Sequence, residues 1–269
     1  MKKKVDSRVQ TLIENNIKQH HRTVLFLVGD RARYQVVNFH YILTRQSMQN
    51  RPNVLWCYNK ELEFSSHQKK RMKEAKNKQM KGLYDENVDD PFDLFISSTQ
   101  IRYTYYDESH KVLGSTFQML VLQDFEALTP NVLCRTIETI EGGGLIIFLI
   151  RHLQSLKQLY TITMDVHQRY RTEAYSDIEP RFNERFILSL SECKSCIFMD
   201  DELNILPISS HIDKIQPIEA GQIINKKAAK ELESLQKDLA EKEIVGALLG
   251  MAKTLDQGKV IMNLVEVLM

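Results

Sequence analysis

Short apolar runs alternate along this chain with stretches whose apolar residues recur every three or four positions. Continuous runs rich in β-branched and aromatic residues are typical of strands that are buried on both faces of a sheet. The runs predict strands at 23–28, 53–57, 101–106, 118–122, 145–150, 195–199 and 203–206. A tight turn at Gly29-Asp30 follows the first of these strands, and helical spacing resumes after it. Strand, turn and helix in this order are typical of the opening of a βαβ unit.

Helical periodicity fills the segments between these strands. Asp6 or Ser7 is placed to cap the first helix, and Asp89 or Asp90 is placed to cap another that begins at Pro91. A helix that begins at Pro130 is expected to continue through residue 140 and to stop at the glycines 142–144. The full set of predicted helices is 5–17, 36–43, 61–81, 92–96, 130–140, 160–171, 181–190, 226–242, 244–254 and 256–269.

Strands that alternate with helices predict an α/β fold, with an open and mostly parallel sheet flanked by helices. We expect an amino-terminal α/β domain over residues 1–208 and a linker over 209–225, where the periodicity dissolves. A helical segment follows over 226–269. The sequence closes inside an apolar helix, at 264–269, and this pattern favours a truncated protein.

Composition narrows the class of protein. The chain has 269 residues, of which 43% are hydrophobic and 26% charged, with a net charge of +1. These values are typical of a globular protein whose partners, if they are nucleic acids, must bind a local surface. No apolar run approaches the ~18 residues of a transmembrane helix, so we expect no membrane partner. Four cysteines are too few for a disulfide framework, which favours a reducing compartment.

Two features sit where nucleotide-binding α/β proteins hold phosphate and Mg²⁺. The turn Gly29–Arg33 follows the first predicted strand, but it has one glycine and no Lys-Ser/Thr pair, so an ordinary turn is the favoured interpretation. Arg31 and Arg33 could still meet an anion. Asp124 ends a strand as a Walker B carboxylate does, although a loop carboxylate or cap is favoured. Together they suggest a degenerate RecA-like, Rossmann-like or flavodoxin-like layout that has lost, or never had, nucleotide chemistry.

Two further clusters are weaker candidates. Cys193 and Cys196 form a lone CxxC, and a closed zinc site needs four ligands, so we expect two structural cysteines and no metal. Asp165 and Arg169 are spaced to pair on one helix face, and His167 lies between them without a nucleophile beside it. A structural polar network is the favoured interpretation of that segment. No catalytic, cofactor-binding or metal residue is assigned.

One local charge excess stands out from the rest of the chain. Residues 69–81 hold seven Lys or Arg and one Glu, a net of +6, which leaves the remaining residues at −5. A solvated helix face and an RNA or ribonucleoprotein contact are both open on charge alone. The candidate RNA-binding residues, which we name the basic run, are Lys69, Lys70, Arg71, Lys73, Lys76, Lys78 and Lys81.

Several long strings resemble the amino-terminal region of eukaryotic RNA cytidine acetyltransferases. They cover nearly the whole chain and weaken between residues 209 and 242. The matching strings are 28–31, 52–58, 64–71, 90–92, 121–131, 138–144, 155–160, 164–167, 169–174, 181–190 and 203–210.

The resemblance implies an activity for the full-length protein. Members of this family form N4-acetylcytidine in small-subunit ribosomal RNA and in transfer RNA, with acetyl-CoA as donor and with ATP and Mg²⁺. It also implies a helicase module and an acetyltransferase domain beyond this region, and a place in the nucleus and nucleolus. Implied partners are the ribosomal RNA precursor, the pre-ribosomal particle, and transfer RNA with an adaptor protein.

The region present here would precede the ATP-binding and acetyl-CoA motifs, so we expect no cofactor in this chain and no catalysis by it alone. Residues 244–269 would begin the helicase module. The domain itself is expected to be a scaffold that contacts RNA or the pre-ribosome. Two alternatives remain open: a protein–protein interaction or homodimerisation module, which could also pack the other domains of the protein, and a vestigial nucleotide-binding domain.

Overall fold

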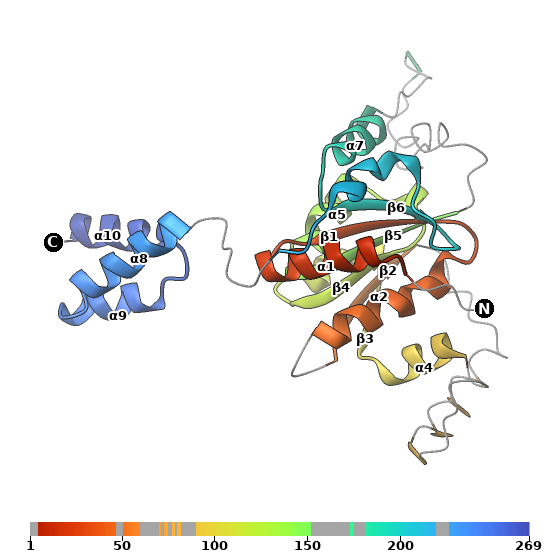
Figure 1. Ribbon diagram of the computed structural model, residues 1–269, viewed down its shortest axis with the longest axis horizontal. Helices are drawn as coiled ribbons and strands as arrows, with labels where there is room; N and C mark the ends of the chain where they lie inside the picture. Colours follow the sequence, from red (N-terminus) through yellow and green to blue (C-terminus); the bar gives the residue numbers. More distant parts are fainter. Residues whose placement is uncertain are drawn as a thin grey trace. The chain divides into compact units, whose positions relative to one another are not determined.

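The computed structural model describes residues 5–46, 51–59, 70, 73–74, 77–78, 80–81, 90–151, 173–174, 181–218 and 226–268. The chain forms two units, Met1–Pro217 and Ile218–Met269, which are described separately below. Figure 1 shows the sheet of the first unit, with the elements labelled.

A six-stranded parallel sheet forms the centre of the first unit, and its strand order is β3-β2-β4-β5-β1-β6. The strands are β1 Thr23–Val28, β2 Val54–Tyr58, β3 Ile101–Tyr105, β4 Phe117–Leu122, β5 Ile140–Ile150 and β6 Cys196–Asp200. Their apolar runs are buried because helices cover both faces of the sheet. The predicted α/β class is therefore confirmed, and every pairing between these strands is parallel.

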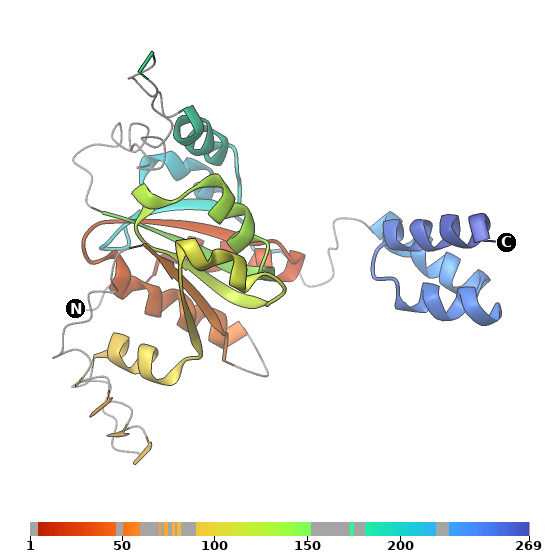
Figure 2. The same cartoon turned by 180° about the vertical axis from the view of Figure 1, so that it is seen from behind.

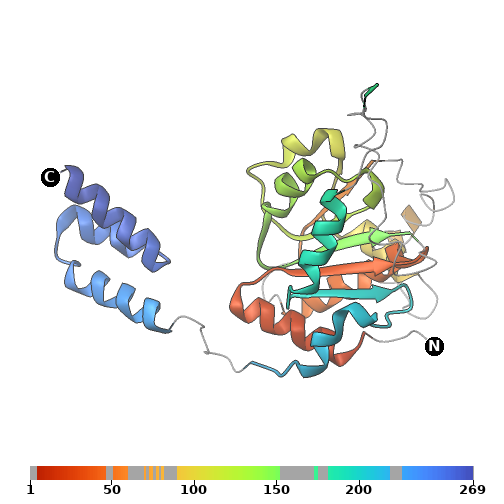
Figure 3. The ribbon, with the colours of Figure 1, turned by 90° about the horizontal axis from the view of Figure 1, so that it is seen from above.

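Three helices and a 3₁₀ segment cover the first face of the sheet. They are α1 Ser7–Gln19, α2 Ala32–Gln46, α4 Pro91–Ser98 and η4 Pro207–Lys214. Val36 and Phe39 of α2 are fully buried there, in the same apolar cluster as Trp56 of β2. Figure 3 shows α1 on one side of the sheet and α5 and α7 on the other.

The second face is covered by α5 Pro130–Ile137, α7 Arg181–Ser191 and the 3₁₀ segments η1 Tyr106–Val112 and η2 Phe125–Ala127. Its centre is a stack of three rings from neighbouring strands. Phe26 of β1 lies 4.4 Å from Phe148 of β5 and 4.5 Å from Phe198 of β6, measured between ring centroids. The three side chains stack because the parallel register places them side by side, and each pair adds about 1 kcal/mol beyond its buried area.

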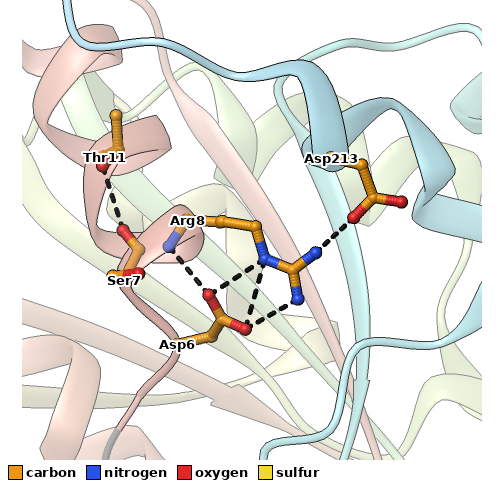
Figure 4. Close-up of polar contacts among 5 residues, drawn as sticks. All are labelled: Asp6, Ser7, Arg8, Thr11 and Asp213. Atoms are coloured by element: carbon orange, nitrogen blue, oxygen red, sulfur yellow. Dashed lines mark hydrogen bonds and ion pairs between the residues drawn. The ribbon is translucent and has the colours of Figure 1, made fainter.

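Side-chain caps fix the starts of the helices on the first face. The Asp6 carboxylate accepts the Arg8 backbone N–H at 2.8 Å, and Asp90 accepts the Phe92 N–H at 3.0 Å. These contacts select Asp6 and Asp90 from the predicted alternatives. The Arg8 guanidinium also pairs with Asp213, and so joins the start of α1 to η4 (Figure 4). Such exposed pairs orient the two segments more than they stabilise them.

The predicted helix over 130–140 is too long, and the glycines after it do not form its stop. Helix α5 ends at Ile137, and the three glycines lie inside β5, which begins at Ile140. A Cβ on Gly144 would lie 2.7 Å from the Gln118 carbonyl oxygen, and one on Gly142 would lie 2.7 Å from the His20 carbonyl oxygen. These glycines therefore permit close backbone approach beside a bulge rather than ending a helix.

Two predictions near the end of the first unit, a strand and the start of the linker, differ from the structure. The predicted strand 203–206 is wrong, since Ile205 makes only an isolated antiparallel bridge to Met199. Within the expected linker 209–225, η4 continues to Lys214 and buries Ile212, while residues 219–225 lie outside the description.

The second unit consists of three helices, α8 Lys226–Asp238, α9 Glu243–Met251 and α10 Leu255–Leu268. Leu232 and Leu249 are buried among them, and the Gln236 side chain donates to the Leu249 carbonyl at 2.8 Å. Figure 2 shows the three helices from behind. In the described part of both units, every helix is too short or too polar to cross a lipid bilayer.

Candidate site at the carboxyl edge of the sheet

The strand order creates a crevice at one particular place on the sheet. The neighbouring strands β1 and β5 are followed, along the described chain, by α2 and α7, which cover opposite faces. In open α/β sheets, ligands bind at such a switch point, outside the carboxyl ends of the strands. The predicted turn at Gly29 and the predicted carboxylate Asp124 both lie at this edge.

A cavity of about 380 Å³ occupies this position. It lies at the ends of β1, β4 and β5 and at the start of α2. Charged and polar side chains contribute much of its lining, which contains two arginines and two aspartates. Its lining includes Gly29, Asp30, Arg33, Gln123, Asp124 and Arg151.

Asp124 is the most buried acid of this site. It adopts a left-handed backbone conformation, with φ 58°, directly after β4, and its side chain is only 4% exposed. One carboxylate oxygen accepts the Asn59 backbone N–H at 3.1 Å, and the other lies 4.0 Å from a guanidinium nitrogen of Arg151. Asp124 thus ties the end of β4 to the ends of β2 and β5, which matches the favoured prediction of a loop carboxylate.

The turn after β1 already holds an anion, and that anion belongs to the chain itself. The Asp201 carboxylate, from the turn after β6, accepts the Arg31 backbone N–H at 3.2 Å. Gly29 has φ +136°, and a Cβ there would lie 2.5 Å from the Asp201 carboxyl carbon. Arg33 turns toward aromatic rings, with its guanidinium carbon 5.3 Å from the centre of Tyr34 and 6.0 Å from that of Phe92. The turn therefore differs physically from a phosphate-binding loop.

The structure describes only part of the basic run, and the run's role stays a prediction. Of its seven members, Lys70, Lys73, Lys78 and Lys81 are described; the first three are helical and Lys81 follows in a turn. Lys70, Lys73 and Lys81 are exposed, and Lys78 is half-buried. Lys69, Arg71 and Lys76 lie outside the description, as do Asp165, His167 and Arg169 and the predicted helix 160–171.

The CxxC pair lies at the start of β6. Cys193 is half-buried and Cys196 is buried, and neither belongs to a disulfide. Burial raises the pKa of the Cys196 thiol, so this sulfur stays protonated at neutral pH. In the ranges that the structure describes, no three His, Cys, Asp or Glu side chains cluster as metal ligands would.

Sequence reasoning missed Asp201 and Arg151 as parts of this edge. Asp201 is 172 residues from Gly29 along the chain, and only the pairing of β6 beside β1 brings them together. Arg151 follows the most apolar strand and faces Asp124 because β4 and β5 are neighbours. The one sequence signal that could have pointed to both residues is their position, because each lies just after a predicted strand.

Comparison with known proteins agrees with the resemblance noted in the sequence. Residues 1–201 match the family model described as tRNA(Met) cytidine acetyltransferase TmcA, N-terminal. The chain is 54% identical over 267 residues to an RNA cytidine acetyltransferase of Mus musculus, with 98% of the chain covered. It is 53% identical over 268 residues to the protein of the same name from Schizosaccharomyces pombe, and 46% identical over 268 residues to that of Saccharomyces cerevisiae.

The chain spans about a quarter of the length of these relatives, 26% of the mouse and fission-yeast proteins and 25% of the budding-yeast protein. The family match covers the whole α/β sheet, from β1 through β6, together with the Gly29 turn and Asp201. The chain therefore belongs to the TmcA amino-terminal domain family, the amino-terminal region of RNA cytidine acetyltransferases.

Proposed function

We propose that this chain is the RNA-contacting scaffold domain of an RNA cytidine acetyltransferase. The whole enzyme would form N4-acetylcytidine in small-subunit ribosomal RNA and transfer RNA, in the nucleolus, with acetyl-CoA and ATP bound by its other domains. Family membership and the names of the relatives support this activity. They do not assign a role to the domain itself, which has to be argued from its own residues.

The position of the basic run carries the RNA-contact proposal. The run lies between Tyr58, the last residue of β2, and Asp90, the cap of α4. The carboxyl end of β2 belongs to the same sheet edge as the Gly29 turn and Asp124, because all six strands are parallel. The basic run, with its net charge of +6, therefore belongs to a connection that starts at the edge where parallel α/β sheets bind ligands. The exposure of Lys70, Lys73 and Lys81 leaves their ammonium groups accessible to phosphates.

Salt dependence of RNA binding tests this proposal. If four or five lysines neutralise phosphates, log K should fall with log salt at a slope of about −3 to −4. A variant with four changes to Glu should bind more weakly and with a flatter slope. Its substitutions are Lys69→Glu, Lys70→Glu, Lys73→Glu and Lys76→Glu.

A matched control keeps the same change in net charge but places it on exposed lysines of the helical unit. Its substitutions are Lys230→Glu, Lys237→Glu, Lys253→Glu and Lys259→Glu. We expect the control to retain most of the affinity and the wild-type slope. Equal losses in both variants would mean that only bulk charge matters, and unchanged binding in the first variant would refute the RNA contact.

We expect the isolated chain to neither acetylate RNA nor hydrolyse ATP. Gly29 is followed by Asp30 and Arg31 rather than by a Lys-Ser/Thr pair, and the turn is filled by Asp201. Asp124 would be the carboxylate that such chemistry requires at this edge. Turnover by the purified chain that disappears in Asp124→Asn would refute this expectation.

An interaction module is the second candidate function, and the helical unit favours it. Ile244 and Met251 of α9 are 73% and 74% exposed, and Leu248 between them is 43% exposed. These three residues share one helix face at spacings of four and three. Exposed apolar stripes of this kind mark contact surfaces. Concentration-dependent sedimentation without RNA binding, abolished by Ile244→Lys, would support this module over the RNA contact.

A further inference from the structure

The turn after β6 is joined to the Gly29 turn and α2 by two hydrogen bonds of Asp201, one to its side chain and one to its backbone carbonyl. The Asp201 side chain accepts the Arg31 backbone N–H at 3.2 Å, and the Asp201 backbone carbonyl accepts the Gln35 side-chain amide at 2.7 Å. Gly29 lacks a side chain at the point where the carboxyl group comes closest. Two segments that are far apart in the sequence therefore meet around one carboxylate.

Asp200 holds this carboxylate in place from the neighbouring position. One Asp200 oxygen accepts the backbone N–H groups of Glu202, at 3.0 Å, and Asn204, at 2.7 Å, and the other accepts the Asn204 side-chain amide at 2.7 Å. Leu203 takes a left-handed conformation, with φ 67°, to complete the turn. The turn is thus closed by its own hydrogen bonds, which hold the backbone on both sides of Asp201.

In nucleotide-binding α/β proteins, a phosphate binds at the turn between the first strand and the following helix, which is the position of the Gly29 turn and the start of α2 here. Backbone N–H groups and the helix dipole favour an anion at that position. Here the Asp201 carboxylate supplies the negative charge and takes up the Arg31 N–H. A phosphate group brought to the same turn would meet a fixed charge of its own sign.

We propose that Asp201 is an internal latch, a carboxylate that occupies the anion position of the Gly29 turn and closes it to phosphate groups. The latch explains how the chain keeps the layout of a nucleotide-binding sheet without its ligand. It also fixes the carboxyl end of β6 to the start of α2. The proposal does not depend on RNA binding, and its test is separate.

Titration of the Arg31 backbone amide by NMR tests the latch, with inorganic phosphate and Mg-ATP as probes at constant ionic strength. In the wild-type chain and in the control Glu202→Gln, which removes an adjacent charge, the amide should not respond. In Asp201→Ala the vacated N–H should shift with phosphate, at an affinity about tenfold or more above the weakest binding that the wild-type titration could detect, because the like charge is removed. Asp201→Asn should give a smaller gain, because its amide oxygen can still accept the bond.

Three results would overturn the proposal. The first is a saturable response of the wild-type Arg31 amide to phosphate or ATP at millimolar concentrations. The second is the absence of any response in Asp201→Ala and Asp201→Asn while their remaining amide signals show a folded chain. The third is an equal gain in Glu202→Gln, since that would assign the effect to net charge. If Asp201→Ala does not fold, the same criteria apply to Asp201→Asn.

Discussion

Replacement of Gly29 by Ala perturbs the latch at its tightest point. The backbone at Gly29 has φ +136°, where a residue with a Cβ is strained by about 1–3 kcal/mol. The added methyl carbon would lie 2.5 Å from the Asp201 carboxyl carbon, so the carboxylate must move and release the Arg31 N–H. The loss of that bond costs about 1 kcal/mol more. We therefore expect Gly29→Ala to lower the free energy of unfolding by about 2–4 kcal/mol.

Urea denaturation can separate the backbone strain at Gly29 from the steric clash with Asp201. The four proteins to compare are wild type, Gly29→Ala, Asp201→Gly and the double variant. Asp201→Gly removes the colliding atoms, so the double variant should be more stable than the sum of the single losses by about 1–2 kcal/mol. Glu202→Gly controls for the added flexibility of the turn. A loss below about 0.5 kcal/mol in Gly29→Ala would refute the reasoning, and additive losses would remove Asp201 from it.

Three further predictions concern other parts of the first and second units. In urea melts, Gly144→Ala should lower the free energy of unfolding by about 1–3 kcal/mol through overpacking, because its Cβ would lie 2.5 Å from Ile140 Cγ2. Gly250→Ala in α9 should instead raise it by about 0.5–1 kcal/mol, because its Cβ would meet no atom within 4 Å. Burial lowers the pKa of His40 below its usual value of 6.5, so the unfolded chain binds the proton more readily than the folded chain. The free energy of unfolding should therefore fall as the pH drops below about 6.5, and His40→Gln should flatten this pH dependence. Iodoacetamide should label the exposed Cys134 in the native chain and the buried Cys196 only after unfolding, as mass spectrometry would show.

Local pattern was enough to find the sheet because its strands are buried on both faces. The runs at Thr23–Val28 and Gln118–Leu122 are continuous and apolar, and they became β1 and most of β4. The same reasoning failed at glycines 142–144, where a turn signal marks close backbone approach within a strand. It failed again at 203–206, where Leu203 is buried but the segment meets β6 only through the single antiparallel bridge between Ile205 and Met199.

The candidate site was predictable only in parts. The Gly29 turn and Asp124 could be found because each directly follows a predicted strand. Their common edge depends on the strand order, in which β1 lies between β5 and β6, and short apolar strands carry no signal for which neighbour they choose. The sequence therefore predicts Asp201 only as part of a turn. Its hydrogen bond with Arg31 could be recognised only from the folded structure.

Crosslinking of the full-length protein to RNA, with the crosslinked residues mapped by mass spectrometry, tests the central proposal most directly. The account predicts crosslinks within residues 60–89 and fewer of them in the variant with four lysines of the basic run changed to Glu. The Gly29 turn should stay free of crosslinks because Asp201 closes it. Crosslinks confined to other domains, with none between Met1 and Pro217, would contradict the account and favour the interaction module.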